Sequence, residues 1–141
     1  MNQKIKINKI GLIRLIRQSK KILIATHVNP DGDAVGSLLA LGLGLKQLKK
    51  KITLYMRDPV PRMYQFLPSR ALIQNALPSQ KFDLTLIVDV GDRERVSDEI
   101  KAFAGCGVTV SIDHPAQGPS DVDFSYCLPK RAACGEIIFE L

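Results

Sequence analysis

Short apolar segments that alternate with helical patterns constrain the fold of this chain more than any other feature. Runs rich in Ile, Leu and Val indicate buried strands; they cover residues 21–26, 51–56, 82–88 and 106–112, with a further strand expected over 122–126. Near-helical spacing predicts helices between them; these are expected over residues 8–19, 34–50 and 95–103, with a short one over 63–67. Such alternation predicts an α/β fold, in which a mostly parallel, doubly wound sheet carries helices on both faces.

The length and composition are those of one ordinary globular domain. A chain of 141 residues is long enough to bury a core, and a content of 45% hydrophobic and 24% charged residues fits that class. No apolar run is long enough to span a membrane and no signal peptide is evident, so a cytoplasmic protein without membrane attachment is expected. Cys106, Cys127 and Cys134 lack CxxC spacing, which argues against a disulfide framework or a zinc knuckle.

The net charge of +6 favours anionic partners such as phosphates or nucleic acid. Much of the excess lies in two clusters, one over residues 4–21 and the other over residues 46–51. Each cluster has a structural alternative, because the first fits a solvated helix face and the second complements a helix C-terminus. Charge alone therefore does not decide the partner.

The junction between the first apolar run and the following helix carries a histidine and two carboxylates. These residues are His27, Asp31 and Asp33. A loop that leaves the carboxyl end of a strand in an α/β sheet is the usual place for a ligand, and one imidazole with two carboxylates suits a divalent metal. The alternative is a turn with a helix N-cap, since Asn-Pro-Asp-Gly-Asp is also good turn chemistry.

Two further predicted strands run directly into ligand-type residues. Asp89 follows residues 82–88, and Asp113 and His114 follow residues 106–112. Because the carboxyl ends of parallel strands lie along one edge of a sheet, these side chains are expected to converge with those of the first junction. The chain has only two histidines, and both belong to this set. The sequence therefore predicts a metal site at that edge.

The donor types also limit the metal and its chemistry. Oxygen-rich coordination with one imidazole per ion suits Mn²⁺ or Mg²⁺ better than Zn²⁺. Sharing these ligands between two ions requires a bridging carboxylate, and Asp89, approached from both sides, is the natural candidate. Two ions about 3.5–4 Å apart activate water and clamp an in-line displacement at phosphorus. The pattern therefore points to phosphoester hydrolysis.

Three segments together resemble the first three motifs of the DHH phosphoesterases. They read HVNPDGDAVGS at 27–37, VDVGDRER at 88–95 and IDH at 112–114, and supporting likeness lies at Val60-Pro61, Phe66-Leu67-Pro68 and residues 135–141. The branch most similar contains bacterial oligoribonucleases that also dephosphorylate 3′-phosphoadenosine 5′-phosphate, related to RecJ-like exonucleases. The likeness runs from about Lys9 to the last residue.

The resemblance implies a two-manganese site, with Mg²⁺ as the alternative ion, and gives each ligand a role. Asp89 would bridge the ions, and Asp113 would orient the site as an acid behind the ligands. The remaining ligands are His27 and Asp31 for the first ion, and Asp33 and His114 for the second. The residues expected to carry the catalytic step are Asp89, Asp113 and His114.

The function implied is manganese-dependent hydrolysis of short oligoribonucleotides or of a nucleoside 3′,5′-bisphosphate. Two alternatives stay open. One is a non-catalytic remnant or regulatory module that binds nucleotide or metal. The other is a hydrolase of the pyrophosphatase or polyphosphatase kind, since such relatives share these motifs.

Three departures from the family pattern lead us to expect weak activity or none. Pro115 stands where the family carries a second histidine, and proline has no side-chain or backbone N–H to donate. Residues 132–134 are Ala-Ala-Cys where relatives usually carry hydroxyls. The fourth motif and the C-terminal substrate-binding domain would lie beyond Leu141, so residues 1–141 are expected to be a partial domain. An incomplete sheet edge would favour self-association.

Overall fold

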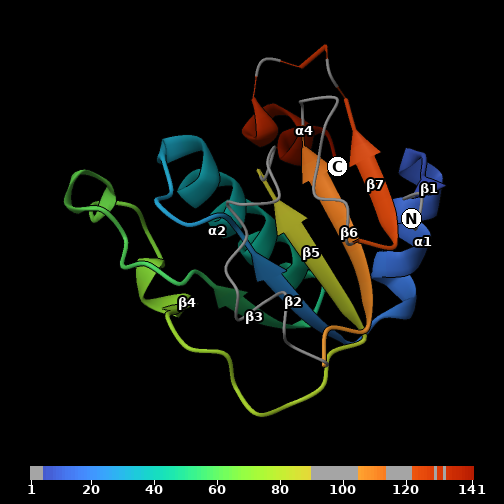
Figure 1. Cartoon of the computed structure of the whole chain (residues 1–141), viewed down its shortest axis with the longest axis horizontal. Helices are drawn as coiled ribbons and strands as arrows, with labels where there is room; N and C mark the ends of the chain where they lie inside the picture. Colours follow the sequence, from blue (N-terminus) through green and yellow to red (C-terminus); the bar gives the residue numbers. More distant parts are fainter. Residues whose placement is uncertain (1–4, 90–104, 114–121, 129, 132) are drawn as a thin grey trace.

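The chain forms a seven-stranded sheet with helices packed on it (Figure 1). The computed structural model describes residues 5–89, 105–113, 122–128, 130–131 and 133–141. The strands are β1 (Ile5–Lys6), β2 (Lys21–Ala25), β3 (Lys51–Tyr55), β4 (Ile73–Gln74), β5 (Leu84–Val88), β6 (Val108–Asp113) and β7 (Phe124–Cys127). Their order is β1-β7-β6-β5-β2-β3-β4, and every neighbouring pair is parallel. The predicted α/β fold with a parallel sheet is confirmed.

The helices follow the predicted pattern closely. They are α1 (Lys9–Gln18), α2 (Gly32–Gln47) and α4 (Cys134–Glu140), with two 3₁₀ turns, η1 (Arg62–Tyr64) and η2 (Arg70–Leu72). Helix α1 begins after Asn8, whose side chain accepts a hydrogen bond from the Gly11 N–H at 2.8 Å. Helix α2 begins two residues before the predicted start, because Asp31 acts as its N-cap. The helix predicted over 95–103 lies outside the described residues.

The core lies on both faces of the sheet because side chains alternate along each strand. Ile22 and Ile24 of β2 belong to a large buried cluster that includes residues of α1, α2 and α4. Leu23 and Ala25 face the other way, into a smaller cluster with residues of β3 and β5. Burying each of the Ile and Leu side chains contributes about 1.5–3 kcal/mol. Within the described part of the chain, no helix is long and apolar enough to cross a membrane.

The order of the strands contains a topological switch between β2 and β5. From β2 the chain passes through α2 to β3 on one side, whereas β5, on the other side of β2, is followed along the sheet by β6. The crevice outside the carboxyl ends of two such strands is where open α/β sheets bind ligands. In Figure 1 the arrows of β5, β6 and β7 point toward the end of the sheet where α4 lies. This end carries the predicted ligands His27, Asp31 and Asp89.

Candidate metal centre

Strand register brings His27, Asp89 and Asp113 into one row. Ala25 of β2 pairs with Ile87 of β5. The Thr26 hydroxyl donates to the Val88 carbonyl at 2.9 Å, which joins the two strands one step further on. His27 and Asp89 therefore follow at the same level. Strands β5 and β6 end in the same way. Val88 pairs with Ile112, so Asp113 lies level with Asp89.

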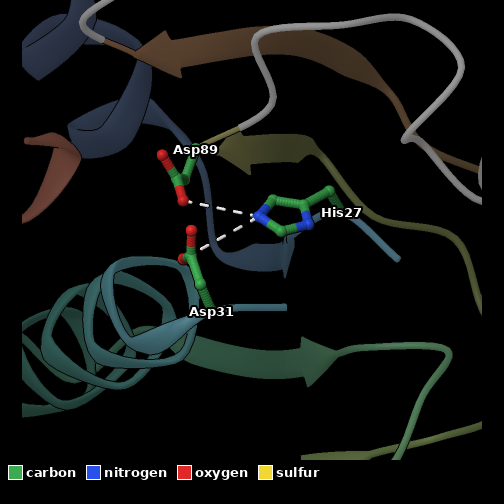
Figure 2. A group of neighbouring side chains, drawn as sticks. All are labelled: His27, Asp31 and Asp89. Carbon is green, nitrogen blue, oxygen red and sulfur yellow. Dashed lines mark ion pairs between the residues drawn. The ribbon is translucent and has the colours of Figure 1, made fainter. Parts of the chain in front are cut away.

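Three of the predicted ligands form a compact group (Figure 2). Nε2 of His27 lies 3.5 Å from Oδ2 of Asp89 and 4.0 Å from Oδ1 of Asp31. Each residue offers one donor atom, and the three atoms lie within 4.8 Å of one another. Two carboxylates from separate loops thus face one ring nitrogen. The convergence predicted for these three residues is confirmed.

The ring of His27 is held in the tautomer that suits a metal ligand. The side chain is buried, with 1% of the residue exposed. Its Nδ1 lies 2.6 Å from the Val28 carbonyl oxygen, which only accepts, so Nδ1 carries the proton and donates. Nε2 is then the ring nitrogen that faces the Asp31 and Asp89 carboxylates. Such a backbone contact fixes both ring orientation and tautomer in metal-binding histidines.

Asp31 serves as both helix cap and site residue, so the two interpretations of this loop are compatible. Its Oδ1 accepts a hydrogen bond from the Ala34 N–H at 2.9 Å, and its side chain is 59% exposed. A carboxylate has further lone pairs beyond the one that caps the helix. The same side chain therefore starts α2 and presents an oxygen to the crevice.

Asp89 has the most perturbed environment of the group. It lies in the left-handed region with φ +57°, where Asp and Asn are the commonest residues after glycine. Burial raises the pKa of its carboxyl above the ordinary value, and the charges of Asp33 and Asp31 raise it further, while the contact with His27 lowers it. A bound divalent cation would reverse this balance, because positive charge favours the ionised carboxylate.

Asp33 and Asp113 lie near this group but outside it. Both oxygens of Asp33 accept backbone N–H bonds from the start of α4, at 2.9 Å from Cys134 and 2.8 Å from Gly135. Asp113 is buried at the end of β6, with 3% exposed. Their expected roles as second-metal ligand and orienting acid stay predictions. The predictions for His114 and Pro115 fall outside the described residues.

Burial and the nearby acidic residues both raise the pKa of the Cys134 thiol. It is fully buried and lies 3.4 Å from the Ile112 carbonyl oxygen, to which it donates. Burial is the main cause that raises its pKa to about 12, and the charges of Asp89, Asp113 and Asp33 add to the effect. The thiol therefore stays neutral near pH 7, and it is poorly suited to act as a nucleophile.

The loop after β3 supports the loop that carries His27 and Asp31, and the sequence did not predict this contact. The Asn29 N–H donates to Oδ2 of Asp58 at 2.7 Å, and Asn29 itself is left-handed with φ +51°. The ring of Tyr64 lies against Gly32, where an added Cβ would come within 3.1 Å of it. The turn chemistry of Arg57-Asp-Pro was the available signal, but it did not indicate which loop Asp58 would hold.

The donor set fits a divalent cation. One imidazole nitrogen and two carboxylates suit Mn²⁺ or Mg²⁺. The gathered acids also leave an excess of negative charge, which a cation would neutralise. Of the predicted ligands, His27, Asp31 and Asp89 offer the first position. Asp33 lies close enough to influence the Asp89 carboxyl electrostatically.

Comparison with known proteins gives a consistent result. The profile of the DHH family, N-terminal domain, matches residues 21–141. A bifunctional oligoribonuclease and PAP phosphatase NrnA from Thermus thermophilus is 33% identical over 121 residues, which cover 85% of this chain and 36% of that protein. This chain thus spans about a third of the relative's length. The crystal structure of an exopolyphosphatase-related protein from Bacteroides fragilis aligns with a TM-score of 0.82 and 24% identity, covering 93% of this chain and 41% of that one. The structural likeness shows the fold.

Proposed function

Because this chain belongs to the DHH family, we propose that it is a manganese-dependent phosphoesterase domain acting on short oligoribonucleotides or nucleoside 3′,5′-bisphosphates. The observation that carries the proposal is the group of His27, Asp31 and Asp89 at the switch between β2 and β5. Its donor types fit Mn²⁺, and its location is the ligand-binding crevice of an open α/β sheet. The name of the Thermus thermophilus relative supports a nucleotide substrate.

Each residue has a defined task in the proposed site. His27 and Asp31 would hold the first ion, Asp33 and His114 would hold the second, and Asp89 would contribute to both. Val28 keeps the His27 ring in its ligating tautomer, and Asp113 orients the site from the end of β6. When bound, the two ions supply Lewis-acid activation of water and neutralise charge that develops at phosphorus.

Pro115 sets an expected limit on the rate. The corresponding histidine of the family would donate to the substrate phosphate, and proline cannot. The loss of one such donor costs on the order of 100-fold in rate. This substitution favours a second candidate function, a module that binds metal and nucleotide without turnover. The two candidates share the metal site and differ in the chemical step.

The decisive experiment combines Mn²⁺ calorimetry with a panel of substrates. We expect Mn²⁺ to bind, slow cleavage of a dinucleotide or a nucleoside 3′,5′-bisphosphate, and no cleavage of pyrophosphate or polyphosphate. Absence of Mn²⁺ binding would overturn the metal site, and preferential cleavage of the inorganic substrates would favour the polyphosphatase alternative. Fast dinucleotide cleavage by the unaltered chain would contradict the limit set by Pro115.

The variant Pro115→His separates the two candidate functions. If the chain is an enzyme with a missing donor, we expect the cleavage rate to rise by about 100-fold while Mn²⁺ affinity stays the same. An unchanged rate with intact Mn²⁺ binding would favour the non-catalytic module. Pro68→His is the matched control, since it makes the same substitution at an exposed position in the loop after β3.

A further inference from the structure

The first turn of helix α4 (Cys134–Glu140) takes hydrogen-bond acceptors from a distant part of the chain. Its N-cap residue is Ala133, which makes no side-chain hydrogen bond, although the first N–H groups of a helix need acceptors. Asp33, about a hundred residues earlier in the chain, supplies them. Its Oδ2 accepts from the Cys134 N–H at 2.9 Å and its Oδ1 from the Gly135 N–H at 2.8 Å.

Glycine at position 135 makes this contact close. A Cβ built on Gly135 would lie 3.2 Å from Oδ1 of Asp33, tighter than ordinary van der Waals contact. Any larger residue would therefore displace the carboxylate by a few tenths of an ångström, or weaken its bond to the backbone. The resemblance to the family marked Gly135 as part of a motif, and the structure supplies a physical reason for it.

Further contacts hold these two amides and their acceptor in place. The Cys134 thiol donates to the Ile112 carbonyl at the end of β6, and Ile137 and Ile138 are buried in the main core with residues of α2. On the other side, the Ser37 hydroxyl donates to Oδ1 of Asp33 at 3.3 Å. Asp33 is thus fixed between the first turn of α2 and the first turn of α4.

These contacts leave one direction open on the carboxylate. Each carboxylate oxygen has two lone pairs. Oδ1 accepts from both Gly135 and Ser37, whereas Oδ2 accepts from Cys134. Among the described residues, these three bonds leave the second lone pair of Oδ2 for another partner.

We propose that the Cys134 and Gly135 amides are positioning groups for the metal centre: they orient Asp33, so that α4 determines the affinity of the second metal position. This inference rests on the proposed function for the identity of the ion. Outer partners of metal-binding carboxylates typically change metal affinity by about 10- to 100-fold. We therefore expect α4 to affect the second ion and to leave the position at His27, Asp31 and Asp89 nearly unchanged.

The first test needs no metal. In a chelator, hydrogen exchange of the amides of residues 134–140 is compared between the wild type and Asp33→Ala. We expect exchange at Cys134 and Gly135 to be at least about tenfold faster in the variant, because their acceptor is gone. Asp83→Asn is the matched control, since Asp83 also accepts from two consecutive amides but at the opposite end of the sheet. Unchanged exchange in Asp33→Ala would overturn the inference.

The second test keeps every carboxylate and changes only glycines. Gly135→Ala places a methyl group against Asp33, whereas Gly44→Ala in α2 meets nothing within 4 Å. By Mn²⁺ calorimetry, we expect the second affinity to fall about tenfold in Gly135→Ala and to stay unchanged in Gly44→Ala. The first affinity should match the wild type in both variants, and circular dichroism checks that both are folded.

The outcomes of this second test separate the inference from the proposed function. A wild type that binds no Mn²⁺ overturns the proposed function. A wild type that binds two ions, together with an unchanged second affinity in Gly135→Ala, overturns the inference alone. An equal fall of both affinities in that variant also overturns it, because α4 would then support the whole loop and not Asp33.

Discussion

The two ends of the parallel sheet shift the pKa of their carboxylates in opposite directions. At the carboxyl end, Asp89 is buried close to Asp31 and Asp33, and burial together with those charges raises its pKa. At the amino end, Asp83 is exposed, and Oδ2 accepts from the N–H groups of Lys20 and Lys21, both at 2.9 Å. Hydrogen bonds from Lys21 and Lys20 are the main causes that lower the pKa of Asp83.

The difference separates a stabilising end from a functional one. The Asp83 contacts favour the charged form at neutral pH and hold β2 beside β5. The gathered acids at the other end oppose their own ionisation, which is typical of sites that await a cation. We therefore expect substitutions at the amino end to change folding, and substitutions at the carboxyl end to change metal binding.

Gly107→Ala should have the largest effect, and only on folding. Gly107 is left-handed with φ +64°, and an added Cβ would meet the Asp83 and Phe82 carbonyl oxygens at 2.5 Å. Backbone strain and overpacking together should cost about 2–4 kcal/mol in the free energy of unfolding. Urea denaturation measures this loss, with Gly44→Ala as control. A variant as stable as the wild type would contradict the described backbone.

Asp89→Asn should show most clearly that the carboxyl end of the sheet serves metal binding and not folding. Asn tolerates the left-handed backbone and its NH₂ group can donate to Nε2 of His27, but it removes the central anionic ligand. We expect Mn²⁺ affinity to fall at least about 100-fold. In a chelator at neutral pH, stability should stay equal or rise by about 0.5–2 kcal/mol, because the unfavourable buried charge is gone. A variant that binds Mn²⁺ normally would argue against the site.

Two buried threonines provide a matched pair. Thr26 donates to the Val88 carbonyl at the carboxyl end, and Thr85 donates to the Cys106 carbonyl nearer the amino end, at 2.9 and 2.7 Å. Replacing either by Val should cost about 1 kcal/mol in the free energy of unfolding. Only Thr26→Val should also weaken Mn²⁺ binding, by less than about tenfold. Equal Mn²⁺ affinities in the two variants would contradict the expectation that only the carboxyl end of the sheet supports metal binding.

Asp83→Asn should give the smallest effect, and its sign depends on pH. Because folding lowers the pKa of Asp83 below 3.8, the stabilising contribution is fully present above that value and is lost as pH falls through the folded pKa. The variant should therefore be less stable than the wild type at pH 7, and this difference should shrink as pH falls through the lowered pKa of Asp83. Urea midpoints across this range measure the difference. A difference that does not change with pH would exclude ionisation as its cause.

Much of the fold and part of the candidate site could be predicted from hydrophobic periodicity and from the residues that follow each strand. The alternating apolar runs predicted the parallel sheet. Because His27 and Asp89 follow neighbouring parallel strands, the same prediction placed them together. The sequence did not predict strands β1 and β4, because two residues are too few to show a hydrophobic alternation. The sequence also did not predict the contact of Asp33 with α4, because a cap supplied from about a hundred residues away leaves no local signal. Ala133 alone suggests an uncapped helix.

The adjacency of β2 and β5 has a consequence for folding kinetics. The Thr26–Val88 contact closes a sequence separation of 62 residues, and the metal group lies one step beyond it. Such non-local pairing forms slowly because the intervening chain must first be ordered. A cation that needs both strand ends would have no preformed site in the unfolded chain. It would bind after this pairing is complete and would slow unfolding more than it speeds folding.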